Sequence, residues 1–333
     1  MTGRRVKPTR RDVMIGAVAT VVGAVAYTKV HDEPSPGVIA GAASAACTVP
    51  DFLVGGATGG NASPATLEDH AGAPYGVRRT YHGSTASAVA AVLENMGAGR
   101  RQSELSFKAP AEWKAMSTGS GDAWAADLAT QLAAAVKGTN HVVRLAVNHE
   151  PENDHVTKSN GAAYTTAEQD AYQRDWTAMQ ARLAPKFTAP GLRFGAIFMG
   201  YHQFYGSQVK RWNLTTCVPR DLPALSWLGF DIYETWGVSG SSKWRPFSTA
   251  YFPQIQAWCT ANNKDWYMSE TGLTEKAFDA RPTWFTDTFA VGQRYGMRGF
   301  SYFNTNLNSI AGWQMVAGDS RETAWLKLVR QYR

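Results

Sequence analysis

The sequence predicts an α/β protein whose fold is a (β/α)8 TIM barrel in a single domain. Eight strand-like segments alternate with helix-like ones over about 280 residues, and neither an internal repeat nor a second domain is visible. The main competing fold is an open doubly wound sheet, which would favour a glycine-rich phosphate loop after an early strand. Residues 55–60 imitate such a loop only weakly, because no convincing helix start follows them.

The predicted strands are short apolar or aromatic runs bounded by turn residues. In chain order they lie at 52–57, 76–82, 104–109, the first half of 141–154, 192–201, 225–233, 266–270 and 299–304. The clearest helices are expected at 122–137, 166–187, 253–262, 283–295 and 322–332. The first of these stops at Gly138, as helices that end in a left-handed glycine do.

Composition and charge limit the possible partners. Hydrophobic residues make up 44% of the 333 residues, which suits a globular protein with a sizeable core. The formal net charge is +6, but the first 26 residues hold five basic residues against one acid, so removing them leaves about +2. That is too little for a nucleic-acid surface. We therefore expect no nucleic-acid partner. No Cys or His spacing resembles a metal site, so we expect no bound metal, and we expect no organic cofactor either.

The N-terminus has the pattern of an export signal, with a basic region, an uncharged run and small residues placed for cleavage. Its Arg10-Arg11 pair resembles a twin-arginine signal. We expect residues 1–26 to be this signal, 27–50 an Ala/Gly/Pro-rich tether and 51–333 the barrel. The mature protein is then a monomer without a membrane span, secreted or in the cell envelope. An uncleaved N-terminal anchor and a Cys217–Cys259 disulfide stay open.

The stretch HVVRLAVNHEPEND, residues 141–154, is an apolar strand that ends in Glu150 and Glu152, and DWYMSETG, residues 265–272, likewise ends near Glu270. Either stretch alone could carry only solvated loop acids. In a barrel, however, the carboxyl ends of all strands converge on one face. Two carboxylates about 5 Å apart can cleave a glycosidic bond, one as nucleophile and the other as acid and then base. The sequence therefore predicts Glu150 and Glu270 as the catalytic pair, with Glu152 as a rival for Glu150.

These motifs resemble a known family. R-x-x-x-x-H-E at the fourth strand, D-x-Y at the sixth and S-E at the seventh are similar to glycoside hydrolase family 26, the β-mannanases and related endo-glycanases. The resemblance implies a retaining hydrolase of a β-linked polysaccharide, with Glu150 as acid/base, Glu270 as nucleophile and Tyr233 donating to the nucleophile. The chain departs from the family in a longer segment before His149 and in Pro-Glu-Asn at 151–153 where the family has Asn-Gly. That departure weakens the substrate assignment more than the reaction class.

Further candidates for substrate binding lie at or near strand ends. They are His149, Tyr233, Trp236, Arg144, Asn148, Tyr201, His202 and Asn304. Trp236 is the preferred stacking platform, because sugars stack their apolar faces on indole rings. Structural alternatives remain: a core role for His149, strand packing for Tyr233, and for Arg144 either an interior charge network or a pairing with the nucleophile.

A second hypothesis is a non-catalytic carbohydrate-binding or surface or phage structural protein on a barrel scaffold. The unusual residues after Glu150 motivate it. The separation of the Glu150 and Glu270 carboxylates discriminates the two: about 5 Å favours retaining catalysis, and more than about 10 Å favours binding alone. An inverting hydrolase would show an intermediate gap.

Overall fold

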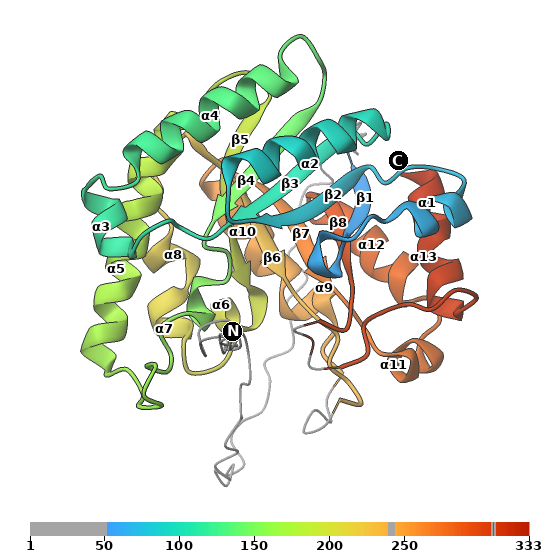
Figure 1. Ribbon diagram of the computed structural model, residues 1–333. Coiled ribbons are helices and arrows are strands. Elements are labelled where there is room, and N and C mark those ends of the chain that lie inside the picture. The colour runs from blue at the N-terminus through green and yellow to red at the C-terminus, as the bar shows by residue number, and fades with distance from the viewer. Residues whose placement is uncertain (1–51, 239–243, 308, 310, 333) are drawn as a thin grey trace, which may run out of the picture. The chain divides into compact units, whose positions relative to one another are not determined.

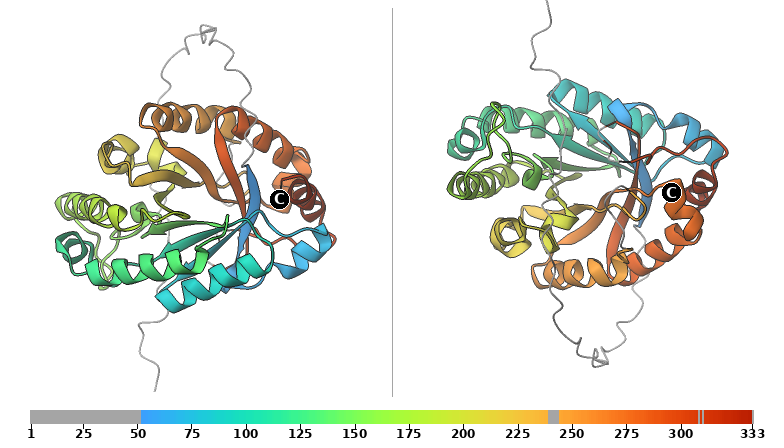
Figure 2. Two further views of the ribbon diagram at one scale, coloured as in Figure 1. Left: turned by 90° about the horizontal axis from the view of Figure 1, so that it is seen from above. Right: turned by 90° about the horizontal axis from the view of Figure 1, so that it is seen from below.

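The computed structural model describes residues 52–238, 244–307, 309 and 311–332, and these form a closed barrel of eight parallel strands inside a ring of helices (Figures 1 and 2). Each strand pairs with its neighbour in chain order, and β1 pairs with β8 to close the barrel. The predicted (β/α)8 fold is confirmed. The predicted signal and tether lie outside the described residues, so export stays a prediction, as does the monomeric state.

All eight strands coincide with predicted segments to within a few residues. They are β1 (Leu53–Thr58), β2 (Val77–His82), β3 (Gln102–Phe107), β4 (Val142–Val147), β5 (Leu192–Met199), β6 (Leu225–Asp231), β7 (Asp265–Thr271) and β8 (Met297–Asn304). Most of their residues are buried whichever way they face, because one side fills the barrel and the other lies under helices.

The larger helices follow the strands and cover the outside of the barrel. They are α1 (Ala65–Ala71), α2 (Thr85–Gly97), α4 (Asp122–Val136), α5 (Thr166–Leu183), α10 (Phe252–Ala261), α12 (Trp284–Arg294) and α13 (Ser320–Gln331). A capping box starts α5, in which the Glu168 amide donates to the Thr165 hydroxyl and the Thr165 amide donates back to the Glu168 carboxylate. Near the chain end, α13 packs beside α1 and completes the ring (Figure 1).

Shorter helices lie in the connections between these elements. They are α3 (Trp113–Thr118), α6 (Gly200–Phe204), α7 (Val209–Trp212), α8 (Leu214–Cys217), α9 (Phe247–Ala250) and α11 (Glu275–Ala280), with 3-10 turns η2 (Gly59–Asn61), η3 (Pro151–Asn153) and η4 (Ala184–Lys186). In η4 the chain changes to 3-10 geometry at a proline, so α5 ends four residues before the predicted 187.

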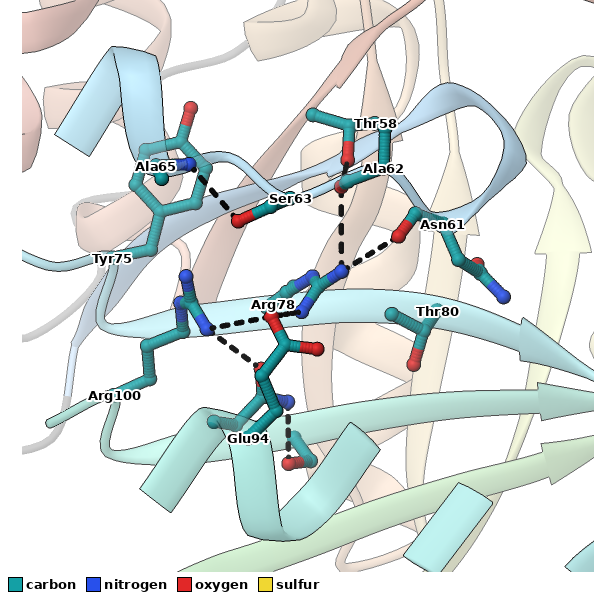
Figure 3. A network of polar contacts seen from close by, with 12 residues as sticks. Thr58, Asn61, Ala62, Ser63, Ala65, Tyr75, Arg78, Thr80, Glu94 and Arg100 are labelled. Carbon is teal, nitrogen blue, oxygen red and sulfur yellow. Dashed lines mark hydrogen bonds and ion pairs between the residues drawn. The ribbon is translucent and has the colours of Figure 1, made fainter. Parts of the chain in front are cut away.

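Two consecutive arginines on β2 point to opposite sides of the strand, because successive side chains in a strand alternate in direction. Arg78 points outward, where its guanidinium donates to Glu94 of α2 (2.6 Å) and to the backbone oxygen of Asn61 (2.7 Å; Figure 3). It thereby ties the turn after β1 to α2. Arg79 points into the barrel and is completely buried. β2 therefore delivers a buried cation to the barrel interior.

Cys217 and Cys259 are both buried and both free, so the disulfide that the sequence left open is not formed. The Cys217 thiol instead donates to the backbone oxygen of Trp212 (3.1 Å). Among the helices of the described residues, none combines the length and the apolar character that a membrane span requires.

Candidate active site

The loop after β4 has an unusual backbone. Asn148 and Glu150 both have positive φ angles, of 52° and 49°, in the left-handed region that costs a glutamate on the order of 1 kcal/mol. The Glu150 amide donates to the Ile197 oxygen of β5 (2.8 Å), and the chain then enters η3. Such strained positions cluster at functional sites, and here the strain turns Glu150 toward the barrel axis instead of into solvent.

Glu270 is placed by irregular strand pairing. It is the sixth residue of β7, and the registers of β6 with β7 and of β7 with β8 both shift next to it. Such irregularities re-aim side chains and are frequent beside active sites. Glu270 pairs with Asp231, the last residue of β6, and both are buried. The shift brings their carboxylates to the same end of the barrel as Glu150.

The three carboxylates converge. One oxygen each from Glu150, Asp231 and Glu270 lies within 4.8 Å of the other two. The two glutamates predicted as the catalytic pair are therefore neighbours at the carboxyl ends of the strands. At least one oxygen of Glu150 lies no more than 4.8 Å from an oxygen of Glu270, which is compatible with the roughly 5 Å spacing of a retaining pair and shorter than the spacing of an inverting pair, which must leave room for a water.

Hydrogen-bond donors surround the Glu270 carboxylate. The hydroxyls of Tyr81 and Tyr233 donate to its two oxygens, and Arg79 Nη1 lies 3.0 Å from Oε1. Both oxygens thus act as acceptors, as they do in a carboxylate anion. Tyr233 is itself held by Trp313, whose ring stacks on it at 5.4 Å between centroids. Tyr233 therefore stands where the family resemblance expects it.

Glu150 has a different environment. Its Oε2 accepts from Asn153 Nδ2 (3.0 Å). Burial, followed by the negative charge of Glu270, raises the pKa of Glu150 to about 7, against the opposing charge of Arg79. Glu150 is therefore protonated at mildly acidic pH beside an acceptor-only neighbour. Two nearby carboxylates with such unequal environments can act as an acid and a nucleophile.

Arg79 balances the charge of this cluster. Its Nη1 donates to Asp231 Oδ1 (2.8 Å) as well as contacting Glu270, and its Nε lies 3.6 Å from Glu104 Oε1. Burial raises the pKa of Asp231 even with Arg79 alongside, and the charges of Glu270 and Glu150 add to the rise. The carboxylates of Glu150, Asp231 and Glu270 form a group that could hold a metal ion, but Arg79 already supplies two of them with a cation.

Arg144 corrects one of the substrate-binding predictions. Its Nη2 lies 3.0 Å from Glu104 Oε2 and its guanidinium stacks on Tyr267 at 3.9 Å, inside the barrel and toward its amino-terminal end. Of the two roles left open, the structure places it in the interior network, and Arg79 makes the ion pair with Glu270. The reason is depth, since Arg144 lies only three residues into β4, well before the loop that carries Glu150.

Asn148 and His149 lie between β4 and Glu150. The His149 ring lies 5.5 Å from the Tyr81 ring, and burial together with the charges of Arg79 and Lys108 lowers its pKa well below the usual value. It is therefore a neutral imidazole beside the carboxylates. Asn148 accepts from the Ala109 amide through Oδ1 (2.7 Å), so its side chain fixes the loop after β3.

The remaining candidates for substrate binding lie at or after the carboxyl ends of β5, β6 and β8. Trp236 is half-buried, with the Lys276 ammonium of α11 5.5 Å over its ring and the Trp244 ring at 5.8 Å, so these two neighbours cover part of its ring. Tyr201 is 42% exposed at the start of α6, next to the half-buried His202. Asn304 accepts from the Met315 amide (2.7 Å) and fixes the loop after β8.

Glu152, the rival of Glu150 for the acid/base role, lies outside the cluster of Glu150, Asp231 and Glu270. It is 1% exposed, accepts from Gln203 Nε2 (2.7 Å) and does not belong to the three-carboxylate cluster. Burial raises the pKa of Glu152 to about 8. It is therefore a neutral buried acid that anchors η3 against α6, and Glu150 is the one of the two that reaches Glu270.

The free energy of unfolding of a Glu152→Gln variant tests the assignment of Glu152 as a neutral buried acid. Glutamine keeps an acceptor for Gln203 and a donor like that of the protonated carboxyl. Because the folded-state pKa is raised, the contribution of Glu152 is present at low pH and is lost between about pH 4.5 and about 8. Urea unfolding should therefore find the variant close to wild type at pH 5 and more stable above pH 8. An unchanged difference across that range would contradict the assignment.

Sequence reasoning missed four residues of the interior network: Arg79, Tyr81, Glu104 and Asp231. The signal for Arg79 was present, because two adjacent arginines in an otherwise strand-like run force one of them inside. A buried arginine requires carboxylate partners. Asp231 was part of the quoted D-x-Y motif without being given a role.

The chain resembles known proteins in fold and not in sequence. No protein-family model matches the chain, and no curated protein matches it in sequence. Among solved structures, a β-glycosidase from Thermosphaera aggregans is 10% identical with a TM-score of 0.55, covering 85% of this chain and 96% of its own. A fungal β-1,4-galactanase is 14% identical with a TM-score of 0.54, covering 82% and 93%. A family 26 endo-β-1,4-mannanase from a Bacillus species is 11% identical with a TM-score of 0.53, covering 84% and 85%.

These likenesses show the barrel fold. The similar structures are glycosidases of several kinds, and family 26 is one of them without being singled out.

Proposed function

We propose that this protein is a glycoside hydrolase that cleaves a β-linked polysaccharide with retention of configuration. The observation that carries the proposal is the approach of the Glu150 and Glu270 carboxylates to within 4.8 Å, in environments that keep one protonated and the other an acceptor. The same gap favours catalysis over the alternative of a binding-only scaffold. The glycosidases of similar fold support the reaction class.

In the first step, Glu270 attacks the anomeric carbon while Glu150 gives its proton to the departing glycosidic oxygen. In the second step, Glu150 takes a proton from water, and the water oxygen displaces Glu270 from the anomeric carbon. Tyr81, Tyr233 and Arg79 hold the Glu270 carboxylate in place for attack. In this proposal neutral His149, whose ring lies 5.5 Å from that of Tyr81, contacts the sugar.

A β-mannan is the first substrate to examine, because the His-Glu, D-x-Y and S-E motifs resemble family 26 and a mannanase is among the similar folds. The purified protein should release reducing sugar from one of a panel of mannans, xylans, β-glucans, galactans and bacterial wall polysaccharides. Glu150→Gln and Glu270→Gln controls should lack that activity. Failure on every polymer, or activity that survives both substitutions, would overturn the proposal.

The pH dependence should follow Glu150. A general acid must be protonated, so kcat/KM should fall as pH rises through about 7, the pKa to which burial and Glu270 raise this carboxyl. Glu150→Gln should remove this limb when an aryl glycoside with a good leaving group is used, because that substrate needs little protonation. A wild-type profile that stays flat to about pH 9 would contradict the role of Glu150.

A further inference from the structure

A cavity of about 780 Å³ opens at the amino-terminal end of the barrel. Its wall includes the first or second residues of six consecutive strands, from Gln102 of β3 to Arg298 of β8. Glu150 and Glu270 lie at the opposite ends of their strands, so this cavity is separate from the proposed active site. Its volume falls in the range of sites that bind small molecules.

Arginine dominates the charge of the cavity. The charged lining residues are Arg100, Arg101, Arg144, Arg193, Arg298 and Asp265. Three of the arginines pair with acids: Arg100 with Glu68 (2.5 Å), Arg144 with Glu104 (3.0 Å) and Arg298 with Asp265 (3.2 Å). Arg193 is exposed and donates to the Leu192 backbone oxygen (2.9 Å), an uncharged acceptor that leaves its positive charge unbalanced. The cavity therefore carries an excess of positive charge.

The inner end of the cavity is built from an arginine and two aromatic rings. Arg144 is only 2% exposed, and its guanidinium lies 3.9 Å from the Tyr267 ring and 5.6 Å from the Trp227 ring, both of which line the cavity. Its buried Nε has no hydrogen-bond partner among the described residues. The two rings and the ion pair with Glu104 fix the guanidinium at the inner end of the cavity, where it adds to the positive charge of the wall.

We propose that this cavity binds a small anion that carries two or more carboxylate or phosphate groups. Arginine forks bind both groups through paired, charge-assisted hydrogen bonds. Arg193 of β5 and Arg298 of β8 line the cavity from two different strands, so an anion with two groups could bind one arginine through each. The site does not depend on the proposed glycosidase activity.

Isothermal titration of the full chain with inorganic pyrophosphate and, separately, with citrate tests this proposal. At least one of them should bind at one site per chain, more weakly as NaCl is raised. The double variant Arg193→Gln/Arg298→Gln should raise Kd about tenfold or more, because it removes two donors of charge-assisted hydrogen bonds. Binding of pyrophosphate alone would assign phosphate chemistry, and binding of citrate alone would assign carboxylate chemistry.

The matched control is Arg174→Gln/Arg220→Gln, which removes the same formal charge from exposed positions that do not line the cavity. Its affinity should stay within about twofold of wild type. Arg193→Glu is a further single variant at an exposed site, where folding is not at risk, and it should abolish binding. No saturable binding of either anion, or an equal loss in the control pair, would overturn the proposal.

Discussion

Glu270→Ala should lower kcat by about 10,000-fold or more on any substrate that the wild type hydrolyses, because it removes the proposed nucleophile that forms the covalent intermediate. The loss should persist with aryl glycosides that have good leaving groups, since attack on the anomeric carbon is still required. Steady-state kinetics of the purified variant measure the effect. Glu275→Ala is the control, an exposed glutamate at the start of α11 that should retain wild-type rates.

Azide distinguishes a missing nucleophile from a misfolded protein. Alanine leaves space where the Glu270 carboxylate stood, so azide should restore turnover of the aryl β-glycoside and give an α-glycosyl azide. Azide with Glu150→Ala should instead give the β-glycosyl azide, because Glu270 still forms the intermediate. Glu270→Ala with wild-type activity, or a β-azide product from it, would contradict the roles assigned to the two glutamates.

Among the substitutions proposed for this protein, Arg79→Met should cause the largest decrease in the free energy of unfolding. Arg79 is fully buried and contacts the carboxylates of Asp231, Glu270 and Glu104, so removing it leaves buried acids without their cation. Breaking such a buried pairing costs about 3–5 kcal/mol. Urea unfolding at pH 7 should show that loss in the free energy of unfolding, and the loss should shrink at acidic pH as the carboxyls take up protons.

The control for this prediction is Arg174→Met, which replaces an exposed arginine of α5 and should change the free energy of unfolding by about 0.5 kcal/mol or less. Arg79→Lys keeps the charge but loses the planar fork, so it should lie between Met and wild type. A loss below about 1 kcal/mol for Arg79→Met would show that the carboxylates do not rely on this cation.

The fold was predictable because strand-like segments, several of them rich in apolar residues such as β5 and β6, alternate eight times with helix-like segments. The pairing of Glu150 with Glu270 followed from one rule, the convergence of strand ends, which needs no contact information. The sequence favoured Glu150 but kept Glu152 as a rival for the acid/base role, because both acids lie in the same loop. That choice depends on the positive φ of Glu150, a local backbone conformation that glutamate itself does not signal.

The interior partners were harder to predict for a related reason. Strands buried on both faces lack the alternation of polar and apolar residues that reveals which face is inside. Arg78 and Arg79 therefore look alike in the sequence, although one binds Glu94 outside the barrel and the other binds Asp231 inside. Whether Trp236 can stack on a sugar depends on its tertiary neighbours, Lys276 of α11 and Trp244, which the sequence does not reveal.

The most direct test of the central claim is to trap the covalent intermediate. The protein should be treated with the 2-deoxy-2-fluoro aryl glycoside of the sugar it hydrolyses, digested and analysed by mass spectrometry. A single label on Glu270, formed as activity disappears, is the expected result. A label on another carboxylate such as Asp231, or turnover of the parent substrate without any labelling and with an inverted product, would contradict it.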